Sequence, residues 1–290
     1  MNWMKFRRVY FFISGTVIAV GVYSLLTWGL NLGVDFKGGA LIEYKIEKEI
    51  STEGATAKIE EKGIAVTSVQ RLGGETYLFR LESVDNEKRE SIKGVLQEVG
   101  GSVEELRFEN VGPSIGPELI KKTIYALVIA AIAILVWITI QFKSFKFGVS
   151  AVLAMLHDSL VLLGLYSLLG HLFAAEVDFL FVTAMLTILS FSVHDTIVVY
   201  DRIRESQKKL GGNLYDLANK AVTETFVRSI NNSFTIIFML VALALLGGST
   251  IKWFAIALLI GTISGTYSSP FVAVPLLVTR DELTSRLKKT

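Results

Sequence analysis

The sequence contains no cysteine, only four prolines and only three histidines among its 290 residues. The absence of cysteine excludes disulfides and thiol chemistry. The histidines are divided between two apolar segments and one loop, so they predict no metal site, and no motif indicates a cofactor. Charged residues make up 19% of the chain and the net charge is +2, so the overall charge gives no indication of a nucleic-acid partner.

Long apolar runs are abundant, in contrast. Hydrophobic residues make up 51% of the chain and the mean hydropathy is +0.51, which indicates that lipid is the solvent for much of it. A membrane-spanning helix needs roughly 20 mostly apolar residues. Six segments meet this requirement and predict a bundle of six transmembrane helices: 9–30, 123–141, 148–170, 179–200, 229–246 and 253–279. The first exceeds the core of a typical secretion signal and no cleavage site follows it, so we interpret it as a retained anchor.

The basic residues of the connecting segments predict the orientation. Lys and Arg resist translocation across the membrane. They gather before the first span, between the second and third, between the fourth and fifth, and in the tail, whereas the two opposite short loops contain one in total. We therefore expect both termini to be cytoplasmic. The expected domains are the N-terminus with the first helix (1–30), an external domain (31–118), helices two to six (119–280) and a cytoplasmic tail (281–290).

The long insert after the first span has the pattern of a small α+β domain. Alternating apolar residues predict strands, and two polar segments with one apolar face predict helices. The expected order is βαββαβ, which is the split pattern of a ferredoxin-like domain between the first and second transmembrane helices. This fold occurs with many unrelated functions, so it identifies none by itself.

Ionisable side chains inside the predicted spans suggest a function, because each costs at least a few kcal/mol in the bilayer. Asp195 lies in the fourth span, and Arg228 begins the fifth, followed on one helical face by Asn231, Asn232 and Thr235. A carboxylate that is ion-paired in one state and protonated in another can carry a proton. The alternative is a static Asp195–Arg228 pair that holds two helices together.

Three further polar residues are weaker candidates for proton coupling. His157 and Asp158 lie near the middle of the third span, where they either take part in the function or form a hydrogen-bonded contact between helices. His194 precedes Asp195 and either relays protons near neutral pH or bonds to a neighbouring helix. In the sixth span, the small residues 261–269 predict close helix packing rather than chemistry, and Pro270 predicts a kink.

Four motifs of this chain resemble the SecF family of protein-export membrane subunits. Residues 33–39, GVDFKGG, look like its G-x-D-F-x-G-G motif after the first span. Residues 192–205, SVHDTIVVYDRIRE, are similar to its fourth-span signature, and residues 228–235, RSINNSFT, to its fifth-span R-[ST]-[IVL]-N-x-S motif. His157 and Asp158 also suit the third span of the family. The resemblance covers nearly the whole chain.

The resemblance implies a subunit of the Sec protein-export apparatus, within the resistance-nodulation-division transporter superfamily, and not an enzyme. It implies a SecD partner, the SecYEG channel and a translocating preprotein as contacts, and the proton gradient of the cytoplasmic membrane as the energy source, with Na⁺ as the alternative ion. The coupling residues of the family correspond to Asp195 and Arg228. Many relatives have Asn where this chain has His194.

The glycine-rich motif of the family places Asp35, Gly38 and Gly39 just after the first span.

Three other functions compete with protein export. A small-molecule exporter subunit of the same superfamily would carry two large outer domains and about twice the spans. An intramembrane aspartyl protease would pair Asp158 with Asp195, but its G-x-G-D pattern is absent and Arg228 would oppose proton sharing. A passive scaffold for a partner is the third.

Overall fold

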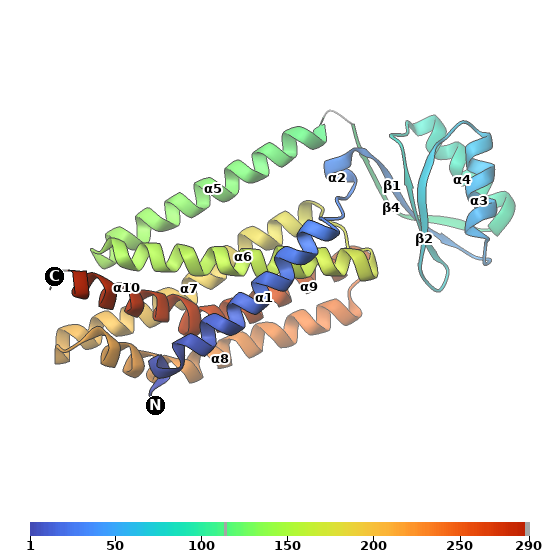
Figure 1. Ribbon diagram of the computed structural model, residues 1–290. Helices are drawn as coiled ribbons and strands as arrows, with labels where there is room; N and C mark the ends of the chain where they lie inside the picture. Colours follow the sequence, from blue (N-terminus) through green and yellow to red (C-terminus); the bar gives the residue numbers. More distant parts are fainter. Residues whose placement is uncertain (113–114, 288–290) are drawn as a thin grey trace. The chain divides into compact units, whose positions relative to one another are not determined.

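The computed structural model describes residues 1–112 and 115–287, and the chain divides into two compact units. One unit consists of Met1–Asn31 and Tyr125–Thr290, and is called the helical unit below. The other is Leu32–Ile124, called the β unit because it contains the sheet. Figure 1 shows both units with their elements labelled.

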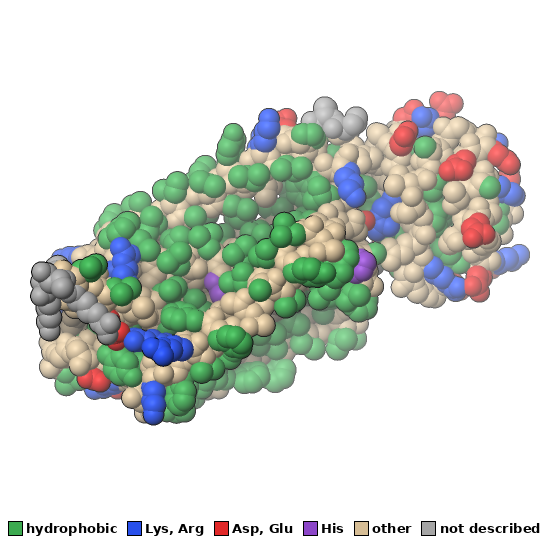
Figure 2. Space-filling view, viewed as in Figure 1, with side chains coloured by type: hydrophobic (Ala, Val, Ile, Leu, Met, Phe, Trp, Pro, Cys, Tyr) green, Lys and Arg blue, Asp and Glu red, His purple; other side chains and the backbone are tan. Residues whose placement is uncertain are grey.

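The prediction of six spans is confirmed, since six described helical segments are long and apolar enough to cross a membrane. The helices that form them follow a short 3-10 turn, η1 (Trp3–Phe6). In chain order they are α1 (Arg7–Thr27), α5 (Ile115–Phe142), α6 (Phe145–Phe173), α7 (Phe179–Leu210), α8 (Leu214–Leu246) and the last span, which comprises α9 (Ser249–Ser268), η2 (Ser269–Ala273) and α10 (Val274–Leu287). Hydrophobic side chains dominate the face of this unit seen in Figure 2. The chain is thus a multi-span membrane protein.

Helices α7 and α8 extend well beyond the predicted spans 179–200 and 229–246. The added turns are polar and carry ion pairs, so they form helix without being apolar. The helices are separated by Gly211 and Gly212, whose φ angles of 63° and 98° favour glycine. Asn213 then caps α8 by accepting a hydrogen bond from the backbone N–H of Asp216 at 2.8 Å.

The last span is interrupted where the sequence predicts a kink. Ser269–Ala273, which includes Pro270, forms a π-helical turn between α9 and α10. Proline cannot donate a backbone hydrogen bond within the helix, and a π-helical turn accommodates that loss. Such turns occur frequently at functional sites.

Small residues bring the helices close together. An added Cβ on Gly164 of α6 would lie 2.3 Å from the Cα of Gly21 in α1, so these two backbones are in direct contact. An added Cβ on Gly261 of α9 would lie 2.2 Å from the side chain of Ile188 in α7. The close packing expected for the sixth span is therefore present. Helices α6 and α7 and the last span are about half buried inside the chain, while α5 and α8 are mostly exposed.

The β unit has the element order β1–α3–β2–β3–α4–β4, preceded by a short helix, α2 (Val34–Lys37). Its sheet has the strand order β2-β3-β1-β4, with each neighbouring pair antiparallel. The bounds are β1 (Gly39–Ile46), α3 (Thr52–Glu61), β2 (Val66–Gly73), β3 (Thr76–Leu81), α4 (Asn86–Gly100) and β4 (Val103–Val111). Ser51 and Asp85 cap α3 and α4 with their side chains.

The core of the β unit lies between one face of the sheet and the helices α3 and α4, which Figure 1 shows on the same side. Alternate residues of β1, including Ile42 and Tyr44, point into it because side chains alternate across a strand. On the opposite face Leu41 packs with Leu78 and with Val34 of α2. Both faces of the central strand are thus covered.

Candidate functional site

Asp195 lies in α7 with 3% of its surface exposed. Its Oδ2 accepts a hydrogen bond from the hydroxyl of Ser229 in α8, with the two oxygens 2.6 Å apart. His194 is mostly exposed, and its Nδ1 lies 3.7 Å from Asp195 Oδ1, within ion-pair distance if the ring is protonated. The structure therefore places a buried carboxylate at the α7–α8 contact, with a histidine beside it.

Arg228 and Asp195 line the same cavity, of about 210 Å³, together with His194, Val198, Ser229 and Asn232. Within residues 1–112 and 115–287 the Arg228 side chain has no hydrogen bond or ion pair. The two predicted coupling residues are thus brought together at one cavity without being joined.

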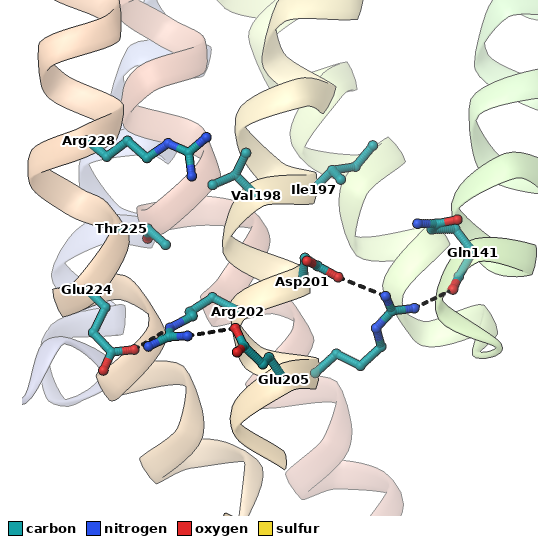
Figure 3. Close-up of a pocket in the computed structure, with 10 residues that line it drawn as sticks. Gln141, Ile197, Val198, Asp201, Arg202, Glu205, Glu224, Thr225 and Arg228 are labelled. Atoms are coloured by element: carbon teal, nitrogen blue, oxygen red, sulfur yellow. Dashed lines mark hydrogen bonds and ion pairs between the residues drawn. The ribbon is translucent and has the colours of Figure 1, made fainter. Parts of the chain in front are cut away.

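Arg228 also lines a second, larger cavity of about 610 Å³ toward the polar ends of α7 and α8. Figure 3 shows its side chain extending from α8 toward Val198 of α7, with charged side chains beyond. Arg202 of α7 binds Glu224 of α8 at 2.5 Å and Glu205 at 2.6 Å. The Arg202–Glu224 pair connects the two helices beyond Arg228.

The other predicted residues of α8 continue on an exposed face. Asn231, Asn232 and Thr235 are all exposed, and the Thr235 hydroxyl donates to the Asn231 carbonyl oxygen at 3.0 Å. Together with Arg228 they form the α8 polar face. Within this chain that face is uncovered.

Asp158 of α6 is fully buried and accepts four hydrogen bonds from three helices. Its donors are Ser192 of α7 and Ser264 and Ser268 of α9, each at 2.6 Å, and Nδ1 of His157 at 3.0 Å. Lengths of 2.6 Å are typical of hydroxyl groups donating to an ionised carboxylate. Ser264 and Ser268 are therefore partners of a buried acid, a role that sequence reasoning missed because small residues also serve packing.

The glycine-rich motif is explained by the backbone of the β unit. Gly38 has φ 78° and Gly39 has φ 115°, conformations that L side chains rarely adopt. A Cβ on Gly39 would also lie 2.6 Å from the carbonyl oxygen of Leu81 in β3. The two glycines thus allow α2 to lead directly into β1, with Asp35 on α2. Among the residues described, no three potential ligands come together to hold a metal ion.

These features define a class: a six-span membrane protein that buries carboxylates between its helices and carries one small α+β unit. The comparisons with known proteins identify the family. The model of the SecD/SecF protein-export membrane proteins, C-terminal part, matches residues 91–282, and the model of the SecD/SecF GG motif matches residues 23–50. The chain belongs to the SecF family, as its motifs indicated.

Relatives match over nearly the whole chain. Protein translocase subunit SecF of Thermobaculum terrenum is 40% identical, with 95% of this chain and 92% of that protein covered. Protein translocase subunit SecDF of Bacillus subtilis is 34% identical, with 93% of this chain but 37% of that protein covered. The crystal structure of SecDF, a translocon-associated membrane protein from Thermus thermophilus, has a TM-score of 0.85 and 31% identity, covering 97% of this chain and 39% of that one. This chain spans about two fifths of these two SecDF chains.

Proposed function

We propose that this chain is the SecF subunit of the Sec protein translocase, and that with a SecD partner it couples proton movement across the cytoplasmic membrane to protein export. Two kinds of relative support this. SecF proteins of similar length share the family, and SecDF proteins join a further, larger part to the region that this chain matches. We infer that the chain is a transport subunit and not an enzyme.

The observation that carries the proposal is Asp195, a buried carboxylate inside a membrane helix that opens onto a cavity containing an unpaired arginine. When the Arg228 guanidinium approaches Asp195, the ionised carboxylate is favoured and a bound proton is released. When Arg228 withdraws toward the larger cavity, burial favours the neutral acid and a proton is taken up. Ser229 holds the carboxylate in place in the structure described. A change in the α7–α8 contact would thereby be linked to proton movement.

The SecD partner is expected to cover the α8 polar face, as defined by Arg228, Asn231, Asn232 and Thr235. Polar groups that face lipid cost several kcal/mol, because the bilayer core offers them no hydrogen bonds. Helix α8 exposes this face over about two turns, and His194 of α7 lies exposed beside the same cavity. A partner helix with polar side chains would remove the cost and complete the proton route.

The β unit is proposed to lie outside the membrane as a ferredoxin-like domain within residues 31–118. Its strand order and antiparallel pairing support that fold, and the basic connections of the helical unit support cytoplasmic termini. We infer that it contacts the preprotein emerging from SecYEG. Asp35, Gly38 and Gly39 would fix its attachment to the first span.

Other readings fit the geometry less well. An aspartyl protease needs two carboxylates that share a proton. Asp158 and Asp195 instead accept hydrogen bonds from different serines, Asp195 from Ser229 alone among the hydroxyls described. A small-molecule exporter is opposed by the single modest α+β unit. A passive scaffold would differ from the proposed proton-coupled subunit in one respect: its function would not require Asp195 to gain and lose a proton.

The Asp195→Asn variant distinguishes a proton-coupled subunit from a passive scaffold. Asparagine keeps the volume and hydrogen-bonding groups but cannot ionise. In inverted membrane vesicles we expect normal levels of the SecD–SecF complex and loss of the export stimulation that the proton gradient provides. Asp216→Asn, which removes an exposed carboxylate at the start of α8, is the matched control and should export normally. Wild-type stimulation in Asp195→Asn would refute the proton-carrier role.

A further inference from the structure

A second buried ionisable centre lies in the helical unit, apart from the Asp195 cavity. Asp158 is fully buried near the middle of α6, and three serine hydroxyls and one imidazole nitrogen all donate to it. Hydrogen bonds donated to a carboxylate favour its ionised form. A carboxylate anion in the bilayer core is more stable when a positive charge lies close by.

His157 is the side chain placed to supply that charge. Its side chain is 8% exposed and its Nδ1 is 3.0 Å from Asp158 Oδ1. Its other nitrogen, Nε2, is buried and has no hydrogen-bond partner in the part of the chain that the structure describes. With Nδ1–H donating to Asp158, the free Nε2 carries a lone pair that can bind a proton.

A buried polar atom without a hydrogen-bond partner costs about 1–3 kcal/mol, so each one beside a charged group calls for an explanation. Every oxygen of Asp158 is satisfied here, whereas Nε2 of its partner is not. The two side chains therefore differ: both carboxylate oxygens of Asp158 accept hydrogen bonds, whereas Nε2 of His157, the atom that would bind a proton, has no partner among the described residues.

We propose that His157 and Asp158 form a second protonation site of the helical unit, in which Nε2 of His157 reversibly binds one proton. In the unprotonated state a neutral imidazole donates to the Asp158 carboxylate. In the protonated state an imidazolium pairs with the same carboxylate, and the net charge of the centre changes from −1 to zero. No bond other than N–H forms or breaks.

The side chains of other helices that contact the centre directly are serine hydroxyls. On α9 the ring of Tyr267 lies 6.3 Å from the His157 ring, and its hydroxyl donates to the carbonyl oxygen of Tyr10 in α1. On α7 the nearest ionisable residues after Ser192 are His194 and Asp195, both within about one turn. The polar and ionisable groups on the elements packed around the centre are Tyr10 and Ser14 of α1, Ser192, His194 and Asp195 of α7, Ser264, Tyr267 and Ser268 of α9, and Ser269 of the π-helical turn. The nearest described ion pair of α10, Asp281 with Lys146, lies about three turns away along α6.

The centre is connected to the helix contacts that coupling would use. Ser192 links Asp158 to α7 one turn before Asp195, and Ser268 links it to α9 directly before the π-helical turn. Binding a proton weakens the attraction between Asp158 and these hydroxyls, so the α6–α7–α9 packing responds to it. This role rests on the proposed function, but the existence of the site does not.

Nitrogen NMR of the full chain in lipid bilayers tests the site directly. The chain has only three histidines, so His171→Gln and His194→Gln together leave His157 as the one labelled imidazole. We expect its Nε2 signal to change from the neutral to the doubly protonated form between about pH 5 and pH 8. A signal that keeps one protonation state throughout this range would overturn the proposal.

Asp158→Asn provides the specificity control. With the carboxylate removed, nothing offsets the imidazolium charge, and we expect the protonated signal to disappear across the same range. An unchanged titration in Asp158→Asn would show that the pair is not the site and would also overturn the proposal. Neither spectrum depends on an export assay, so a failure here and a failure of the Asp195→Asn test remain distinguishable.

Discussion

The two units of this chain distribute their polar and apolar side chains in opposite ways. In the β unit the fully buried residues are largely apolar or aromatic, such as Ile42 and Ile92, and charged side chains cover the outside. In the helical unit hydrophobic side chains cover the outside, while Asp158, Asp195 and several serines lie inside. Each surface matches its solvent, water for one unit and lipid for the other.

The interiors differ for another reason. Burying apolar residues stabilises the β unit, since water is expelled. Lipid is as apolar as leucine, so the helical unit gains little from burying apolar residues and is held by close packing and hydrogen bonds between helices. A buried carboxylate is a costly way to obtain such bonds, which is why we connect Asp158 and Asp195 with function rather than with stability.

The comparison predicts its largest effect for a charge added to an exposed apolar position. Ile129 is 66% exposed at the middle of α5, and Leu106 is 48% exposed on β4. Ile129→Lys should make the free energy of membrane insertion of the α5 segment less favourable by about 3–4 kcal/mol, because lysine then faces hydrocarbon and the small favourable contribution of isoleucine is lost. A fragment of residues 37–112 contains the whole core between the sheet and helices α3 and α4, so we expect it to fold alone. In this fragment Leu106→Lys should change the unfolding free energy by less than about 0.5 kcal/mol. Equal effects on insertion and unfolding would remove the distinction between the units.

A moderate effect is expected where backbones touch. Gly164→Ala forces a Cβ against the Cα of Gly21, and neither backbone can move without separating α1 from α6. We expect a loss of about 1–3 kcal/mol, seen as a lower thermal midpoint of the detergent-solubilised protein. Gly15→Ala is the control, because its Cβ would meet nothing within 4 Å. Identical midpoints for the two variants would contradict the packing described.

The smallest effect concerns two buried tyrosines of the β unit. Burial raises the pKa of Tyr44, and its hydroxyl has no partner among the described residues, so it is a neutral group buried at a cost. The Tyr77 hydroxyl instead accepts the backbone N–H of Ile50 at 3.2 Å. In urea unfolding of the 37–112 fragment, Tyr44→Phe should leave the unfolding free energy unchanged or raise it by up to about 1 kcal/mol. Tyr77→Phe should lower it by about 1 kcal/mol. The reverse order would contradict the contacts described.

Much of the architecture could be predicted from the sequence, because a bilayer requires long apolar runs and a sheet with one buried face requires alternating apolar and polar residues. The element order predicted for the insert, βαββαβ, is the order found from β1 to β4, and six described helical segments correspond to the six predicted spans. The C-terminal end of α7 and the N-terminal end of α8 could not be found from hydropathy, since these turns are polar and are fixed by ion pairs such as Arg202–Glu224.

The candidate site was predictable in part. Asp195 and Arg228 could be selected because charges inside spans are rare, but their separation depends on side-chain positions that no pattern specifies. The donors Ser264 and Ser268 of Asp158 could not be selected, because a serine that packs and a serine that binds a carboxylate have the same spacing. Only the contact between α6 and α9 distinguishes the two roles.

The central claim is that the helical unit moves protons through Asp195. The direct measurement is proton flux into vesicles that contain the SecD–SecF complex, followed with a pH-sensitive dye after a gradient is imposed. The account predicts flux for the wild type and for the Asp216→Asn control, and none above lipid leakage for Asp195→Asn. Flux through Asp195→Asn at the wild-type rate would contradict it.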